Sequence, residues 1–236
     1  MANGSPLKPA KEMAENNPVR IPHESAEYRA ARTVLLAEEI ELRRHIERVA
    51  EMRRALPPGG EVCGNYQFMA EDGSTTDLAG LFGDKQTLGI YSAMYGPKMQ
   101  RPCPMCTNVV GPWDVVADDL AQQMSFVVVA RSPIERLKEW KRERGWQHIR
   151  LYTDLNDNYS RDYFGVSPEG GDEPSISVFT RRDGTIRHFW TSEMFGSSLA
   201  DPGQDGRGAP DPSPLWSMLD NTPEGRPAHW YPSLTY

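Results

Sequence analysis

The sequence has few cysteines, no long apolar run and no cluster of positive charge. Only three of its 236 residues are cysteine, which excludes the dense disulfide framework of a small secreted domain. No stretch approaches the roughly 18 apolar residues that a membrane-spanning helix needs. The net charge is −7, and no run of Lys and Arg marks a nucleic-acid surface. We therefore expect neither a membrane nor a nucleic acid as a partner.

The N-terminus also lacks the apolar segment of a secretory signal peptide. It reads MANGSPLKPAKEMAENNPVR, which is polar throughout. We therefore expect a cytoplasmic protein. In that reducing compartment, paired cysteines are more often catalytic or metal-binding than structural.

The chain also has few His and Cys residues at the spacing of metal ligands. Its five histidines are scattered, and no two of them have the spacing of a zinc-ligand pair. They are His23, His45, His148, His188 and His229. A c-type haem would need a histidine directly after Cys106, where Thr107 stands. We expect no metal and no other cofactor.

The chain divides into four parts by composition. Residues 1–22 are predicted to be flexible, 23–60 to form a helical arm and 61–195 to form the main domain. Residues 196–236 are predicted to wrap back onto that domain, because this extension holds large aromatic side chains that favour burial. They are Trp216, Trp230, Tyr231 and Tyr236.

The helical arm begins after Ser25 as N-cap and ends before Pro57 and Pro58. An apolar stripe recurs along it every seven residues. It consists of Leu35, Leu42, Val49 and Leu56, with Ile46 beside them. This stripe fits a helix packed on its own domain and equally a homodimer formed through the N-terminal helix.

The main domain alternates strand and helix patterns. A hairpin with an Asp-Gly turn (65–78) precedes three apolar strands (86–96, 125–130 and 148–153), and a second Asp-Gly hairpin follows (174–190). A helix is predicted from Ser132 as N-cap to Gly145, with a capping box at Glu135. This order predicts an α/β domain with a mixed sheet.

Two of the three cysteines form the motif Cys103-Pro104-Met105-Cys106 between a predicted strand and a helix. With Cys103 at the N-cap and Pro104 at the first helical position, the helix dipole favours a thiolate at Cys103, and Arg101 adds positive charge. Cys106, one turn further in, is expected to be less exposed. This arrangement favours a redox dithiol, with metal binding and simple packing as alternatives.

Several motifs in the chain resemble a known family. RALPPGG, RPCPMC, PIERL, ERGW, RRDGTIRHFW and DPGQD are similar to those of a widespread bacterial family of thioredoxin-like proteins of unassigned function, often labelled predicted dithiol-disulfide oxidoreductases. The resemblance covers residues 28–236. It implies a thioredoxin-like mixed sheet flanked by helices, with a long N-terminal helix and the aromatic tail packed on the domain.

The resemblance also implies roles for single residues. Pro174 in PSISVF matches the proline that faces the dithiol in thioredoxins, and we expect a cis peptide bond before it. Arg101, Pro104 and Met105 are candidate supporting or substrate-binding residues. Tyr91 in the preceding strand and His188 in the last strand complete the predicted site, although the pattern favours an ordinary strand position for His188 over a role in the site.

The chain departs from thioredoxin in three ways. Ile90 stands where thioredoxins have a buried acid, a loop is inserted at 94–102, and Pro-Met replaces Gly-Pro between the cysteines. The threonine of the peroxiredoxin motif is also absent, because Gln100 lies three residues before Cys103. These departures argue against thioredoxin-style turnover and peroxide reduction.

The sequence therefore predicts a thiol-disulfide oxidoreductase that acts on an unidentified disulfide or small-molecule substrate. Cys103 would attack and Cys106 would resolve the mixed disulfide. Two alternatives stay open: a ligand-binding or assembly module with an inactive dithiol, and a non-redox enzyme that modifies a small molecule.

Overall fold

The structure is a computed structural model of the chain, and it describes residues 7–193, 218–219, 222–225, 227 and 230. The chain divides into two compact units, Met1–Met52 and Arg53–Tyr236. The four-part division made from the sequence stays a prediction. Among the described residues, no helix is long and apolar enough to cross a membrane.

The first unit contains the short helix α1 (Ala10–Glu15) and most of the long helix α2 (Ala26–Arg54). The Ser25 hydroxyl accepts the backbone N–H of Tyr28 at 3.0 Å, which confirms the predicted N-cap. Helix α1 lies in a stretch for which the sequence predicted no order. It is ordered here because Ala10 and Ala14 are buried.

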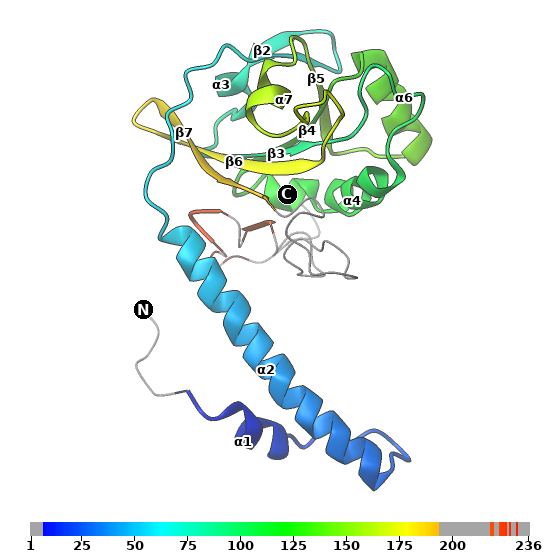
Figure 1. The fold of residues 1–236 in the computed structure, drawn as a ribbon, viewed down its shortest axis with the longest axis vertical. Helices are drawn as coiled ribbons and strands as arrows, with labels where there is room; N and C mark the ends of the chain where they lie inside the picture. Colours follow the sequence, from blue (N-terminus) through cyan, green and yellow to red (C-terminus); the bar gives the residue numbers. More distant parts are fainter. Residues whose placement is uncertain (1–6, 194–217, 220–221, 226, 228–229, 231–236) are drawn as a thin grey trace. The chain divides into compact units, whose positions relative to one another are not determined.

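The second unit is built on one seven-stranded sheet with the order β2-β1-β5-β4-β3-β6-β7 (Figure 1). Its core strands β3, β4 and β5 are parallel, and β6 and β7 continue the sheet antiparallel from β3. Antiparallel β1 and β2 extend the other edge. The strands are β1 (Gln67–Ala70), β2 (Thr75–Asp77), β3 (Thr87–Ser92), β4 (Ser125–Ala130), β5 (Arg150–Asp154), β6 (Ser175–Arg182) and β7 (Thr185–Thr191).

Helices cover both faces of this sheet, and each face has its own core cluster. Helices α4, α5 and α6 pack on the face of the first cluster, which holds Cys106, Tyr91 and Trp140. Helices α3 and α7 pack on the opposite face, where Ile90 and Tyr159 are buried. The helices are α3 (Leu78–Leu81), α4 (Pro104–Val115), α5 (Ala117–Leu120), α6 (Ile134–Arg144) and α7 (Asn158–Asp162).

This architecture confirms the predicted α/β class, with a mixed sheet flanked by helices and a long N-terminal helix. Both predicted hairpins form around their Asp-Gly turns. At the second turn, Asp183 and Gly184 have φ values of 50° and 78°, as a tight hairpin turn requires. Strands β3 and β4 are buried along their whole length, as their continuous apolar sequences predicted.

The predicted capping box of α6 is wrong. The N-cap is Pro133, and it makes no side-chain cap. The Ser132 hydroxyl instead donates to the carbonyl of Gly96 at 3.3 Å, and the Ser132 carbonyl accepts the Thr153 hydroxyl at 2.8 Å. Tertiary bonds therefore take the groups that the local pattern assigned to the cap. The helix does end at Gly145, which is left-handed with a φ of 70°.

The described residues of the C-terminal extension pack on the second unit. Met218 and Leu219 are buried in the cluster that holds Cys106, and Trp230 packs against the same cluster. Glu224 accepts the Thr87 hydroxyl at 2.9 Å. The other aromatic residues expected to be buried by this extension, Trp216, Tyr231 and Tyr236, lie outside the described residues.

Candidate functional site: a dithiol at the start of helix α4

The two cysteines lie where the chain passes from β3 through the loop 94–102 into α4. Cys103 is the N-cap residue of α4, with Pro104 at the first helical position, as the sequence predicted. The backbone N–H of Cys103 donates to the Met94 carbonyl at 3.0 Å. The Cys103 carbonyl accepts both the N–H and the hydroxyl of Thr107, at 3.0 and 2.9 Å. The first turn of α4 therefore fixes the backbone that carries the outer thiol.

The two thiols differ in exposure. Both are free, and Cys103 is half-buried whereas Cys106 is 1% exposed. Burial raises the pKa of Cys106 to about 11, although hydrogen bonds with Tyr91 and the Met94 N–H act in the opposite direction. The Met94 N–H lies 3.4 Å from the Cys106 sulfur. The inner thiol is thus held as the neutral form, whereas the outer cysteine is partly exposed.

Tyr91 is the part of β3 that meets the dithiol. Residues alternate between the two sheet faces, so Tyr91 lies on the Cys106 face and Ile90 on the opposite face. Burial raises the pKa of the Tyr91 hydroxyl, and the neighbouring Cys106 and Cys103 raise it further. Its ring packs edge-on against Trp113 at 5.2 Å. A phenol, rather than a carboxylate, is therefore the acidic side chain beside Cys106.

The loop 94–102 is fastened to α6 and to the end of β4. The carbonyls of Gly96 and Met99 accept side-chain donors from Ser132 and Arg136. The Arg136 guanidinium also lies 4.5 Å from the ring of Tyr95. Gly96 is a glycine because any side-chain carbon there would collide with the carboxylate of Asp172. The loop is thus a fixed wall of the site rather than a plain insertion.

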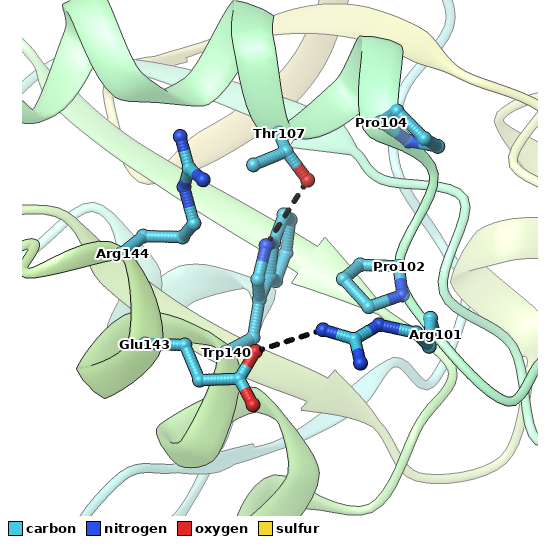
Figure 2. A pocket seen from close by; sticks show the side chains of 7 residues that line it. All are labelled: Arg101, Pro102, Pro104, Thr107, Trp140, Glu143 and Arg144. Atoms are coloured by element: carbon cyan, nitrogen blue, oxygen red, sulfur yellow. Dashed lines mark hydrogen bonds and ion pairs between the residues drawn. The ribbon is translucent and has the colours of Figure 1, made fainter.

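Beside Cys103 lies an open pocket of about 500 Å³, which we call the Arg101–Arg144 pocket (Figure 2). Its wall brings together the end of the loop, the first turn of α4 and the last turn of α6. Trp140 Nε1 donates to the Thr107 hydroxyl at 3.2 Å across its floor, and Arg101 pairs with Glu143 at 3.4 Å. The lining residues are Arg101, Pro102, Pro104, Thr107, Trp140, Glu143 and Arg144.

The predicted supporting residues are only partly brought together. Arg101 and Pro104 line the pocket, and Met105 lies in the first turn of α4. The register of β3 with β6 pairs Ser92 with Ser175, which places Pro174 at the same end of the sheet as the cysteines. The prediction of a cis peptide bond before Pro174 is wrong. The bond is trans, as are all others in the described part of the chain, which is the usual X-Pro preference.

His188 lies on the other face of the sheet from Cys106, so it is not part of this site. Its ring stacks on Tyr163 at 5.9 Å and meets Phe179 edge-on. Its Nε2 hydrogen-bonds the Thr191 hydroxyl at 2.6 Å, and burial lowers its pKa. Side chains alternate between the two faces of the sheet along β7, and His188 lies on the same face as Phe179, its pairing partner on β6.

Sequence reasoning missed the far wall of the pocket. Thr107, Trp140, Glu143 and Arg144 were treated as parts of helices, because nothing local links residue 107 to residues 140–144. The basic last turn of α6 was visible in KRERG, but such a turn is usual at a helix C-terminus. The structure adds that this turn faces the start of α4.

The geometry suits thiol-disulfide chemistry. An accessible sulfur at a helix N-terminus can attack, and a buried sulfur one turn later can complete the exchange. Within the described part of the chain, no three His, Cys, Asp or Glu side chains gather as metal ligands would.

Structures with a similar fold come from peroxiredoxins and thioredoxins. Peroxidoxin BcpB from Mycobacterium tuberculosis is 14% identical with a TM-score of 0.44, and the match covers 58% of this chain and 84% of that one. A PrxQ mutant from Xylella fastidiosa is 14% identical with a TM-score of 0.45, and the match covers 58% of this chain and 84% of that one. The lipoprotein thioredoxin Etrx1 from Streptococcus pneumoniae is 14% identical with a TM-score of 0.40, and the match covers 54% of this chain and 87% of that one.

Family membership rests on the sequence. A comparison with curated proteins found no match. One family model covers almost the whole chain, from residue 18 to residue 236. The chain therefore belongs to the family described as "Bacterial protein of unknown function (DUF899)".

Proposed function

We propose that this chain is a thiol-disulfide oxidoreductase of the reducing cytoplasm. Cys103 is the attacking thiol and Cys106 is the resolving thiol. The observation that carries the proposal is the unequal placement of the two sulfurs: Cys103 is the half-buried N-cap of α4, and Cys106 is buried with a pKa raised to about 11. A dithiol that exchanges with substrates needs this division between an accessible nucleophile and a protected partner.

The exchange proceeds in two balanced steps. The Cys103 thiolate attacks one sulfur of a substrate disulfide, forms a mixed disulfide and releases one substrate thiolate. Cys106 then loses its proton and attacks the Cys103 sulfur, which breaks the mixed disulfide and releases the second substrate thiolate. The two released thiolates take up protons, one of which comes from Cys106. The protein dithiol is oxidised by two electrons, and the substrate disulfide is reduced to two thiols.

Single-cysteine variants test the assignment of the two roles. The purified full-length chain, Cys103→Ser and Cys106→Ser are mixed with hydroxyethyl disulfide, quenched by alkylation and analysed by mass spectrometry. We expect the wild type to form a Cys103–Cys106 disulfide. We expect Cys106→Ser to accumulate a mixed disulfide on Cys103, and Cys103→Ser to react far more slowly at Cys106.

Cys63→Ser is the matched control, because Cys63 is exposed and free. It should form the internal disulfide as the wild type does. If Cys103 and Cys106 both stay free in the oxidised wild type, the proposal fails. The same pocket would then serve a protein with an inactive dithiol, as a ligand-binding or assembly module.

A further inference from the structure

We propose that the Arg101–Arg144 pocket selects small disulfides that carry carboxylates. The inference rests on the proposed function and names the substrate class of the same dithiol. A carboxylate of the substrate would bind Arg144 and Arg101 while its disulfide lies at Cys103.

The charges that line the pocket are unequal. Two guanidinium groups face one carboxylate, and that carboxylate, Glu143, is paired with Arg101. Arg144 makes no hydrogen bond or ion pair with another described residue, although Lys141 and Arg142 in the same helical turn are paired with Glu71 and Glu139. The positive charge of Arg144 is thus left for a ligand, and Figure 2 shows Arg144 among the side chains that line the pocket.

The pair between Arg101 and Glu143 is weak enough to exchange. Its two side chains are 80% and 47% exposed, and the nitrogen and oxygen are 3.4 Å apart. Exposed ion pairs of this kind contribute little to stability. A substrate carboxylate placed between Arg101 and Arg144 would make charge-assisted hydrogen bonds to two guanidinium groups, whereas Glu143 is paired with one. Arg101 can therefore turn from Glu143 to an incoming anion at little cost.

The pocket has the size and position for a small molecule at the thiol. Its volume of about 500 Å³ lies in the range of small-ligand sites. Pro102 and Pro104, the two neighbours of Cys103 in the chain, both line it, and Thr107 binds the Cys103 carbonyl. A ligand in the pocket would therefore contact the residues on both sides of Cys103 in the chain, and a cationic ligand would be opposed by Arg144.

Three symmetric disulfides that differ in charge test the selectivity. They are dithiodipropionate, which is dianionic, hydroxyethyl disulfide, which is neutral, and cystamine, which is dicationic. The second-order rate of oxidation of the Cys103–Cys106 dithiol is measured for each at low salt. Each rate is divided by that of free dithiothreitol with the same disulfide, which removes differences in intrinsic reactivity.

We expect the normalised rate to fall in the order dianion, neutral, dication. In Arg144→Gln, the rate with dithiodipropionate should fall about tenfold, the scale of one lost charge-assisted hydrogen bond, while hydroxyethyl disulfide stays within about twofold. In Glu143→Gln, the rate with dithiodipropionate should rise. Added salt should reduce the preference in the wild type, because the charges are open to solvent.

Arg142→Gln is the matched control, since it removes the same charge from the same turn of α6 outside the pocket. Arg142→Gln should leave the order of the three normalised rates and the ratios between them unchanged. If Arg144→Gln and Arg142→Gln affect dithiodipropionate equally, or if the wild type shows no preference, the charge selectivity is refuted. The oxidoreductase function would still stand as long as hydroxyethyl disulfide oxidises the dithiol. If none of the three disulfides oxidises it, both proposals fail.

Discussion

At the scale of single residues, the site depends on which face of β3 each side chain takes. Ile90 stands where thioredoxins have a buried acid, yet it packs on the face away from Cys106. Tyr91, the next residue, is the one that meets the inner thiol. A phenol beside a thiol can donate a hydrogen bond to the thiolate, but it is not ionised near neutral pH, so it has no phenolate oxygen to accept the proton of the thiol.

The raised pKa of Cys106 predicts a pH dependence for the resolving step. Burial disfavours the thiolate, so with a pKa of about 11 only roughly one thiol in a thousand is ionised at pH 8. The rate at which the mixed disulfide on Cys103 is resolved should therefore rise about tenfold per pH unit between pH 7 and 10. Quenched-flow alkylation measures this rate. A flat profile over that range would contradict the assignment of a neutral resolving thiol.

Tyr91→Phe should slow the same step. The variant keeps the ring that packs on Trp113 and removes the hydrogen bond that lowers the pKa of Cys106, so this pKa should rise further. The resolving rate at fixed pH should fall about three- to tenfold, the equivalent of one hydrogen bond. Tyr95→Phe is the control, since it removes a hydroxyl from a neighbouring buried ring that packs on Trp140. Equal slowing in both variants would contradict a specific role for Tyr91.

At the scale of elements, Asp114 connects helix α4 to the start of β5. Its buried carboxylate accepts the backbone N–H groups of Gln147, His148 and Ile149 at 2.8–3.1 Å. Burial acts to raise the pKa of Asp114, but these three N–H groups outweigh it and the pKa is lowered. The carboxylate therefore joins the helix that carries the dithiol to the segment that follows α6, the helix of the far pocket wall.

Asp114→Ala should destabilise the second unit by about 3 kcal/mol, because it removes an ionised acceptor and leaves backbone donors unpaired. Urea unfolding at pH 7 measures this loss. Since the folded pKa lies below the unfolded value of about 3.9, the difference from wild type should persist down to about pH 5 and shrink below about pH 4. Asp118→Ala, which removes an exposed carboxylate paired with His148, should cost less than about 1 kcal/mol. Equal losses in both variants would contradict this role of Asp114.

The elements and the site differ in how far the sequence predicts them. Asp-Gly turns, continuous apolar runs and the proline after Cys103 act locally, so the hairpins, β3, β4 and the start of α4 were predicted correctly. The prediction of the α6 cap was wrong because the Ser132 hydroxyl donates a hydrogen bond to the carbonyl of Gly96, which is far away in the chain. The Arg101–Arg144 pocket could not be predicted for the same reason. It forms only when α6 packs beside α4.

At the scale of the whole molecule, the long helix α2 keeps an apolar stripe exposed. Leu35 and Leu42 are 51% and 55% exposed, and Leu56, which lies just past the end of α2, is 43% exposed. Val49 and Ile46 on the same stripe are half-buried. Large apolar side chains repeated every seven residues on an open helix are the pattern of a coiled-coil seam. We therefore propose that two copies of the chain form a homodimer through the N-terminal helix.

A second copy of the chain is the occupant that matches this stripe, because a seam with a seven-residue repeat is complementary to itself. The wild type should be a dimer in multi-angle light scattering, and the double variant Leu35→Glu and Leu42→Glu should be a monomer. Ala30→Glu places a charge at an exposed position of α2 off the stripe and should stay dimeric. The double variant should keep the dithiol reaction, since both substitutions lie in the first unit and the dithiol in the second. A monomeric wild type, or a dimer that survives both glutamates, would refute pairing through α2.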